Sequence, residues 1–265
     1  MRARKRFGQH FLEPAWVHKV LHAIAPAATD RFLEIGPGRG ALTLPLARAA
    51  SRVVAVEVDR DLAAALRQRV PANVEVIDGD FLTIDVGPHL EWDESSPWRV
   101  AGNLPYYITS PILVRLFQLH RDGRPMADAT LMLQREVADR LSAQPGTRDY
   151  GVLTVTAQRV VRVDRVLDLP PGAFRPAPRV HSALVRLTFR TGDDRIEVPP
   201  AFDDLVRSVF TQRRKRLSNA LRPFAESGGR SAEGVLQATG IDGSRRPESL
   251  SLPEFAELAR HFDPN

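Results

Sequence analysis

Short apolar runs alternate with helix-like stretches through the first half of the chain, and this alternation limits the fold more than any other feature. Five runs rich in Val, Ile and Leu predict buried strands, at 32–35, 53–56, 74–77, 99–101 and 130–133. Stretches with helical periodicity lie between them, at 42–50, 61–69 and 111–120. Ser110 and Pro111 are typical of a helix start. Strands that alternate with helices predict an α/β fold, in which helices cover both faces of a parallel sheet.

The second half of the chain has a different pattern. Two segments, 153–157 and 182–187, predict strands that pair antiparallel at one edge of the sheet. The pattern changes near 191–194, and helical periodicity then covers 203–221, 232–239 and 253–262. We therefore expect a sheet domain over residues 1–191, followed by a small helical domain over residues 192–265.

The composition is that of a soluble globular protein. Of the 265 residues, 43% are hydrophobic and 26% are charged, and no apolar run is long enough to span a membrane. The chain has no cysteine, which excludes disulfides and thiolate metal sites and fits a reducing cytoplasm. We expect a cytoplasmic monomer that needs neither a metal ion nor a membrane.

The charge distribution favours a polyanionic partner. The net charge is +5 and the sequence pI is near 10.2. Basic residues cluster in three places: the first six residues, the stretch 159–190 and the stretch 206–222. Any one of these clusters is as readily a solvated face as a binding surface. Three clusters that flank the segment 103–106, a candidate for binding a nucleobase, together favour RNA.

A glycine-rich turn follows the first predicted strand. Gly36, Gly38 and Ala41 have the spacing of a dinucleotide-binding loop, which keeps an NAD-binding dehydrogenase as an alternative. Two neighbours oppose a pyrophosphate ligand, because Pro37 lacks a backbone N–H and Glu34 adds negative charge. S-adenosylmethionine, with its ammonium and sulfonium groups, suits this loop better.

Two acidic residues follow the next strands of the predicted sheet. Glu57 ends the second strand, where a carboxylate can hold ribose hydroxyls. Asp80 follows the third strand and can accept a hydrogen bond from the adenine amine of the cofactor. Each acid alone is more often a cap or a solvated loop residue. Because Glu57 and Asp80 follow the strands that come next after the glycine turn, the two acids together favour a cofactor site.

The tetrapeptide Asn103-Leu104-Pro105-Tyr106 follows the fourth predicted strand. The Asn103 amide oxygen and a backbone carbonyl, of Leu104 or Pro105, can accept the two N–H bonds of an exocyclic amine. Tyr106 can stack on the base that carries this amine. The set predicts methyl transfer to an adenine amino group. The alternatives are an Asx turn at Asn103 and core positions for Tyr106 and Phe174.

In these motifs the chain resembles the ribosomal RNA adenine dimethyltransferase family, in particular its small-subunit (KsgA/RsmA) branch. The resemblance runs nearly end to end and rests on five motifs in the family's order, at 7–12, 34–38, 103–106, 174–182 and 212–219. It implies a Rossmann-like class I S-adenosylmethionine-dependent methyltransferase. Residues 1–191 would be its cofactor-binding catalytic domain, and residues 192–265 a small helical domain that binds rRNA.

The resemblance also implies roles for particular residues. The cofactor-binding set is His10, Leu12, Gly36, Gly38, Glu57, Asp80 and Asn103. The catalytic set is Asn103, Leu104, Pro105, Tyr106 and Phe174, with the two aromatic rings on opposite faces of the target base. Apart from the resemblance, the basic stretch 206–222 predicts an RNA-binding set of Arg213, Arg214, Lys215 and Arg216, whose arginines we expect to contact phosphates. This sequence departs from common family residues at His10, where Asn is frequent, and at Arg179 and His181, where Lys and Asp are common.

The activity that the resemblance implies is dimethylation of N6 on two adjacent adenines near the 3′ end of 16S rRNA. The substrate would be the small ribosomal subunit or its precursor, with a role in ribosome biogenesis. A large-subunit methyltransferase of the resistance (Erm) type shares the motifs at 103–106 and 174–182, but the segment 212–219 argues against it. A DNA adenine methyltransferase more typically has a second Pro where Leu104 stands. An assembly factor would act chiefly by binding immature particles.

Overall fold

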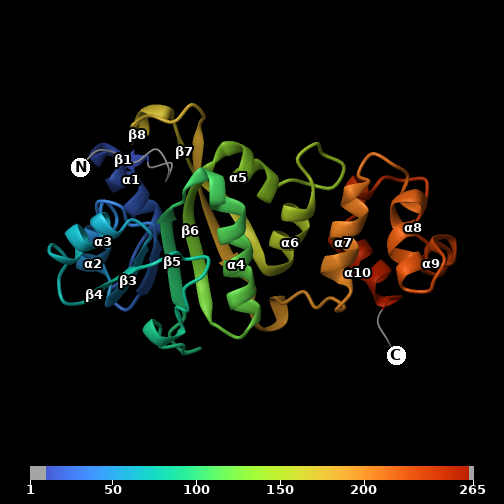
Figure 1. Cartoon of the computed structure of the whole chain (residues 1–265), viewed down its shortest axis with the longest axis horizontal. Helices are drawn as coiled ribbons and strands as arrows, with labels where there is room; N and C mark the ends of the chain where they lie inside the picture. The colour runs from blue at the N-terminus through green and yellow to red at the C-terminus, as the bar shows by residue number, and fades with distance from the viewer. Residues whose placement is uncertain (1–9, 263–265) are drawn as a thin grey trace. The chain divides into compact units, whose positions relative to one another are not determined.

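A computed structural model describes residues 10–262, so the first nine residues, which include Phe7-Gly8-Gln9 and the first basic cluster, lie outside the described part. The main sheet is built from β2 (Arg31–Ile35), β3 (Arg52–Glu57), β4 (Val74–Asp78), β5 (Trp98–Asn103), β6 (Met126–Gln134), β7 (Val161–Leu169) and β9 (Ser182–Phe189). Its strand order is β4-β3-β2-β5-β6-β9-β7, and Figure 1 labels β3, β4, β5, β6 and β7 of this sheet. The five strands predicted from apolar runs are confirmed.

The first five strands of this order run parallel. β2 pairs in parallel with both β3 and β5, β3 with β4, and β5 with β6. Consequently the carboxyl ends of these strands meet at one edge of the sheet, where ligands bind in open α/β folds. β9 pairs antiparallel with β6, as predicted for the segment 182–187.

The described residues up to Val160 contain six α-helices: α1 (Pro14–Ile24), α2 (Thr43–Ala49), α3 (Arg60–Arg67), α4 (Thr109–Arg121), α5 (Arg135–Leu141) and α6 (Val152–Val160). Val20 and Ile24 of α1 and Leu46 of α2 pack in one core with Phe32 and Val53 of the sheet. All five side chains are fully buried, and each such burial stabilises the fold by about 1.5–3 kcal/mol.

The start of α4 differs from the prediction. α4 begins at Thr109 and continues a 3-10 turn, η3 (Tyr106–Ile108), and Ser110 does not cap it. The Thr109 hydroxyl donates to the Pro105 carbonyl at 3.1 Å, which fixes the turn before Ser110 is reached. Pro111 lies within the first turn, where a missing N–H costs no helical hydrogen bond.

The predicted strand at 153–157 is wrong, because this segment lies inside α6. The backbone N–H of Gly151 donates to the Thr154 hydroxyl at 3.1 Å, and that hydroxyl donates to the Arg140 carbonyl at 2.6 Å. Gln158 donates to the Ala143 carbonyl at 2.9 Å. These bonds hold the β-branched segment in a helix against its local preference for a strand.

The chain forms two compact units. The sheet unit extends to Ala138 and resumes over Arg162–Phe189, and the helical unit combines Asp139–Val161 with the chain from Arg190 onward. The predicted boundary at 191/192 is close to the second change of unit, but the sequence pattern does not place Asp139–Val161 in the helical unit. The reason is burial: Tyr150 lies in the core of the helical unit and donates to the Leu250 carbonyl at 2.8 Å.

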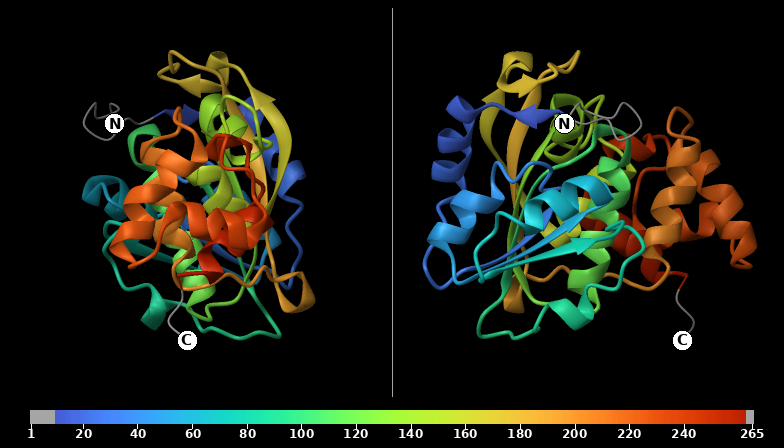
Figure 2. Two further views of the ribbon diagram at one scale, coloured as in Figure 1. Left: turned by 90° about the vertical axis from the view of Figure 1, so that its right-hand side faces the viewer. Right: turned by 60° about the vertical axis from the view of Figure 1, so that its left-hand side comes forward.

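The helical unit also contains α7 (Phe202–Thr211), α8 (Leu217–Ser227), α9 (Ala232–Thr239) and α10 (Leu252–Arg260), drawn in orange and red in Figure 2. The predicted single helix over 203–221 is wrong, since a turn at 212–216 separates α7 from α8. The Leu217 N–H donates to the Arg245 carbonyl at 2.6 Å, and the Ser218 N–H donates to the Gly243 carbonyl at 3.1 Å. These bonds satisfy the first N–H groups of α8 and fix where it starts.

Among the described residues, no helix is long and apolar enough to cross a membrane.

A separate two-stranded sheet pairs β1 (Phe11–Leu12) with β8 (Phe174–Arg175), antiparallel. The Glu13 N–H also donates to the Ala173 carbonyl at 2.9 Å. These bonds attach the N-terminal segment to the motif at 174–182.

Gly102 allows β2 and β5 to approach closely beside the carboxyl edge. It faces Ile35 in the parallel register, and a Cβ added to Gly102 would lie 2.6 Å from the Ile35 carbonyl oxygen. Such a contact between a side-chain carbon and a backbone atom forces the strands apart.

We therefore predict that Gly102→Ala lowers the free energy of unfolding by about 1–3 kcal/mol, the usual cost of overpacking. Gly172→Ala is the matched control, because nothing lies within 4 Å of its added Cβ. Urea unfolding followed by tryptophan fluorescence measures both variants, since Trp16, Trp92 and Trp98 all belong to the sheet unit. Equal midpoints for the two variants would contradict the close-approach argument.

Candidate active site

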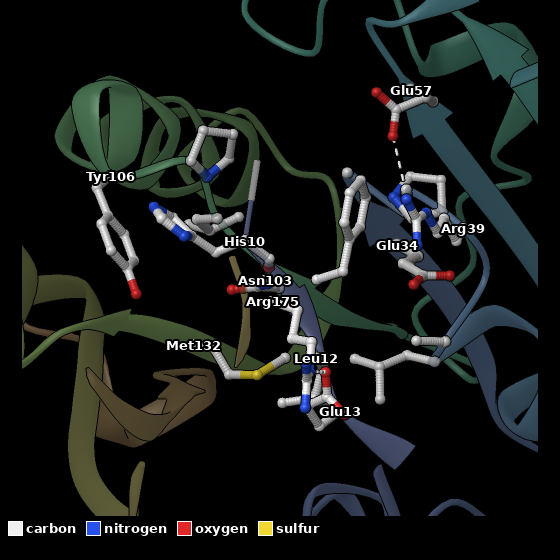
Figure 3. A pocket seen from close by; sticks show the side chains of 18 of the residues that line it. His10, Leu12, Glu13, Glu34, Arg39, Glu57, Asn103, Tyr106, Met132 and Arg175 are labelled. Carbon is white, nitrogen blue, oxygen red and sulfur yellow. Dashed lines mark hydrogen bonds and ion pairs between the residues drawn. The ribbon is translucent and has the colours of Figure 1, made fainter. Parts of the chain in front are cut away.

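A cavity of about 330 Å³ lies at the carboxyl edge of the parallel strands. Its lining comes from the N-terminal segment 10–14, the glycine turn, the end of β3 and the tetrapeptide after β5. Figure 3 shows Glu34 and Glu57 on one side of the cavity, with His10 and Tyr106 on the other. Its size is in the range of small-molecule sites.

The glycine turn has the backbone geometry that its sequence requires. Gly36 has φ +70° and Gly38 has φ +56°, in the left-handed region that favours glycine. A Cβ on Gly38 would lie 3.2 Å from the ring of Phe11, which packs over the turn. The Gly38 N–H donates to Glu57 Oε2 at 2.8 Å, so the turn is fixed to the end of β3.

Glu34 is a buried carboxyl group that lines the cavity. The residue is 2% exposed, and its Oε2 has no hydrogen-bond partner. Burial raises its pKa from 4.5 to about 8, and the negative charge of Glu57 adds to the rise. An unpartnered buried carboxyl oxygen is costly, and a cationic ligand would offset that cost.

Glu57 is held more firmly than Glu34. Its Oε1 accepts the Asp59 N–H at 2.9 Å, while its Oε2 accepts the Gly38 N–H. Burial raises the pKa of Glu57, and these backbone hydrogen bonds work in the opposite direction. The next residue, Val58, lines the cavity and is 37% exposed, so an apolar contact adjoins the carboxylate.

The amide of Asn103 has a defined orientation. Its Nδ2 donates to the His10 carbonyl at 2.6 Å. A carbonyl only accepts hydrogen bonds, so the amide nitrogen must face His10 and Oδ1 is left as an acceptor at the cavity. The side chain therefore presents an acceptor of the kind predicted from the sequence.

The Leu104 and Pro105 carbonyls are the two candidates for the second acceptor of the amine, and they differ in the hydrogen bonds that they already accept. The Pro105 carbonyl already accepts from the Ile108 N–H at 3.1 Å and from the Thr109 hydroxyl. These bonds build the start of α4, so the Leu104 carbonyl is the better second acceptor. The Leu104 N–H donates to the Met132 carbonyl at 3.2 Å, which fixes its peptide against β6.

Tyr106 and His10 form the aromatic side of the cavity. Their rings stack with centroids 5.4 Å apart and planes 24° apart. The Tyr106 hydroxyl bonds to Ser182 Oγ at 2.6 Å, and His10 Nδ1 donates to the Pro176 carbonyl at 2.6 Å. Both rings are thus anchored to the motif at 174–182.

The structure brings most of the predicted residues together. The cavity is lined by His10, Leu12, Gly36, Gly38, Glu57, Asn103, Leu104, Pro105 and Tyr106. Phe174 is not among them, because its side chain is 1% exposed and packs in the core with Ala173 and Leu184. Asp80 is also absent from the lining, and its Oδ1 accepts the Leu82 N–H at 2.9 Å in a turn after β4.

Some lining residues are not predicted by the sequence motifs. Met132 reaches the cavity because it pairs with Asn103 in the parallel register of β5 and β6. Aligning the ends of the predicted strands would have found it. Glu13 and Arg175 also line the cavity and form an ion pair at 2.7 Å, which only the pairing of β1 with β8 brings together.

The predicted RNA-binding set divides into two kinds of residue. Arg213 is partly buried, and its Nε donates to Glu248 at 2.6 Å. It also donates to the Arg148 carbonyl, so its side chain braces the turn between α7 and α8. Arg214, Lys215 and Arg216 are exposed on that turn. Within the described residues, no group of three or more potential ligands gathers as a metal site.

The residues of the cavity fit S-adenosylmethionine. Glu34 offers a buried, unpartnered carboxyl oxygen to a cation, and the glycine turn lets a ligand approach the backbone closely. Val58 and Leu12 add apolar surface. Asn103 then presents an acceptor next to this space, where a second molecule can place an amine.

Comparisons with known proteins agree with this geometry. A family model described as ribosomal RNA adenine dimethylase matches residues 1–259. The chain is 44% identical to a Bordetella petrii protein named ribosomal RNA small subunit methyltransferase A, over 97% of this chain and 94% of that protein. A dimethyladenosine transferase structure from Plasmodium falciparum matches with a TM-score of 0.77 and 26% identity, over 96% of this chain and 97% of that one. The 23S rRNA methyltransferase ErmE matches with a TM-score of 0.65 and 26% identity, over 96% of this chain and 100% of that one.

The raised pKa of Glu34 predicts a pH dependence of stability. The folded chain holds this proton up to about pH 8, whereas the unfolded chain loses it near 4.5. Between these values the folded state binds more protons, so the contribution of Glu34 to the free energy of unfolding falls as pH rises. Glu34→Gln has no such proton to lose.

The measurement is urea unfolding of the wild-type chain and Glu34→Gln between pH 5.5 and 9. We expect the wild-type free energy of unfolding, relative to that of the variant, to decrease with pH and to level off above about 8. A difference that stays constant over this range would show that Glu34 does not titrate as described.

Proposed function

The chain belongs to the ribosomal RNA adenine dimethylase family, and from this premise we propose that it dimethylates N6 of two adjacent adenines near the 3′ end of 16S rRNA. The methyl donor is S-adenosylmethionine, and the substrate is the small ribosomal subunit or its precursor. The same reaction gives the protein a role in subunit biogenesis.

One observation carries the proposal. The Asn103 amide is oriented by the His10 carbonyl so that its oxygen faces the cavity beside the glycine turn. An amine with two N–H bonds needs acceptors, and Asn103 Oδ1 and the Leu104 carbonyl supply them. This arrangement supports adenine N6 as the methylated atom.

The cofactor would be held by residues at the ends of three strands. Glu34 offers a buried carboxyl group, and the ammonium or sulfonium charge of the ligand would favour its ionised form, while Glu57 offers carboxyl oxygens to the ribose hydroxyls. Gly36 and Gly38 allow close approach along the turn. Asp80 keeps its proposed contact with the cofactor adenine only if its carboxylate turns from Leu82 toward the ligand.

The chemistry requires alignment more than acid–base catalysis. When bound, S-adenosylmethionine would supply an electrophilic methyl group to the N6 lone pair, and its sulfur would take the electrons of the broken carbon–sulfur bond. The Asn103 amide oxygen and the Leu104 carbonyl accept hydrogen bonds from the N–H groups of N6. These bonds favour a pyramidal nitrogen and stabilise the positive charge that develops on it. The proton is then lost from N6 to water.

Stacking on the flipped adenine is assigned to Tyr106. Its ring is anchored by Ser182, and stacking contributes about 1–3 kcal/mol per base toward the cost of leaving the RNA stack. Phe174 is buried in the core, so in this conformation it supports β8 rather than contacting the base. His10 stacks on Tyr106, so the base uses the other face of that ring or displaces His10.

Large-subunit methylation and particle assembly are the two alternative functions. Large-subunit methylation is less well supported, since the chain is 44% identical to a protein named small-subunit methyltransferase, and the dimethyladenosine transferase structure matches with a higher TM-score, 0.77, than ErmE, 0.65. An assembly factor would bind particles without needing the oriented Asn103 amide.

The substrate is tested with methyl-labelled S-adenosylmethionine and three acceptors: unmethylated small-subunit particles, large subunits and duplex DNA. We expect label in small-subunit RNA alone. Label in the large subunit would favour the ErmE-like activity, and particle binding without label would favour an assembly factor.

The role of Asn103 gives a sharper prediction. Asn103→Ala should lower the rate of methyl transfer by about 10²–10³-fold, the usual effect of removing one aligned hydrogen-bonding group from a transition state. Particle binding, measured by sedimentation, should be retained. Calorimetric titration with S-adenosylmethionine separates lost catalysis from lost cofactor binding. A variant that transfers methyl groups at the wild-type rate would refute the role of Asn103.

The exposed cations of the helical unit give another prediction. Single charge reversals at Arg214, Lys215 or Arg216 should weaken particle binding. They should also make the slope of log affinity against log salt concentration shallower, by about 0.7 for each phosphate that the variant no longer neutralises. Arg230→Glu is the control, because it reverses an exposed charge outside the cluster. If all four variants bind with the wild-type salt slope, this turn does not contact phosphates.

A further inference from the structure

Large apolar side chains are exposed at four places in the described part of the chain. These are Val58, Tyr107, Val166 and Val180. Tyr107 is the most exposed of them, at 59%. It directly follows Tyr106, which lines the cavity, and Val58 lines the cavity itself. Exposed apolar surface next to a binding site is typical of a contact with the partner that the site receives.

The backbone explains why the two tyrosines point in different directions. Both lie in the 3-10 turn η3, where three residues complete a turn and successive side chains diverge by about 120°. Tyr106 therefore faces the cavity when Tyr107 faces outward. The Ile108 N–H and the Thr109 hydroxyl both bond to the Pro105 carbonyl, so the turn that carries the exposed ring is fixed.

The neighbouring motif supplies positive charge. Ser182, which bonds to the Tyr106 hydroxyl, ends a segment on which Arg179, Val180 and His181 are all exposed. Arg175, on the same segment, is 83% exposed in its side chain and pairs with Glu13. Exposed cations and an exposed aromatic ring thus flank the Tyr106–Ser182 bond along the chain, and proteins hold single-stranded nucleic acid with this combination.

We propose that Tyr107 is a stacking platform for the nucleotide next to the target adenine. This inference rests on the proposed function, since it assumes an RNA base in the cavity. When an adenine leaves its stack, the adjoining base loses one stacking partner, and the fixed, exposed ring that follows Tyr106 in the chain replaces it. The platform accepts any base, because every base has an aromatic face.

Base stacking on Tyr107 predicts how a series of variants binds small-subunit particles. Tyr107→Ala should weaken binding of small-subunit particles by about 5- to 150-fold, the loss expected for one stacked base. Tyr107→Phe should bind like the wild type, because the hydroxyl takes no part in stacking. Val166→Ala is the matched control: it removes an exposed apolar side chain from the same unit, on β7.

The experiment measures particle affinity by sedimentation in the presence of S-adenosylhomocysteine, so that no methyl transfer is required. Cofactor binding by calorimetry checks that each variant keeps an intact cavity. A weaker affinity in Tyr107→Ala, with wild-type affinity in Tyr107→Phe and Val166→Ala, supports the platform. Equal affinities for Tyr107→Ala and the wild type overturn it, as does an equal loss in Tyr107→Phe.

A photo-crosslinking amino acid at position 107 identifies the contacted partner. We expect crosslinks to a nucleotide adjoining the adenine that the wild-type chain methylates. Crosslinks to a ribosomal protein, or to distant RNA, contradict the proposal. Wild-type methylation is assayed in parallel, so a failure of the proposed function, with no methylated adenine, is distinguishable from a failure of the platform alone.

Discussion

The close parallel pairing of β2 with β5 is the constraint on which the rest of the site depends. Ile35 lies opposite Gly102, and there is no room between the strands for a side chain on Gly102. The glycine turn leaves one strand at this level and Asn103 ends the other. A loop suited to a cationic cofactor and an acceptor suited to an amine therefore adjoin each other without either being strained.

Contacts from the N-terminal segment fix the orientation of the side chains that follow the strands. The His10 carbonyl orients the Asn103 amide, and the His10 ring contacts both Tyr106 and the Pro176 carbonyl. The Tyr106 hydroxyl in turn bonds to Ser182. Three segments far apart in the sequence thus hold one another around a single cavity, and each positions a group that the reaction needs.

Much of this arrangement could be predicted because parallel strands that are buried on both faces have continuous apolar runs, and their carboxyl ends share one edge. The properties that depend on tertiary packing could not be predicted from the sequence. The β-branched segment around Val155 resembles a strand locally but is held as α6 by bonds to distant carbonyls. The motif at 174–182 names Phe174 as a base contact, yet its burial depends on the core beneath β8. Arg213 belongs to a basic cluster in the sequence, but in the structure its guanidinium group forms an ion pair with Glu248.

The most direct test of the account identifies the methylated atom. Small-subunit RNA treated with the protein and S-adenosylmethionine is digested to nucleosides and analysed by mass spectrometry against authentic standards. Because Asn103 and Leu104 present acceptors to an exocyclic amine, we expect methylation at N6. Membership of the dimethylase family adds a second methyl group, so the expected product is N6,N6-dimethyladenosine, formed through the N6-monomethyl product. Methylation at a ring nitrogen, at carbon or at the ribose 2′-hydroxyl would contradict it, since none of those atoms offers two N–H bonds to these acceptors.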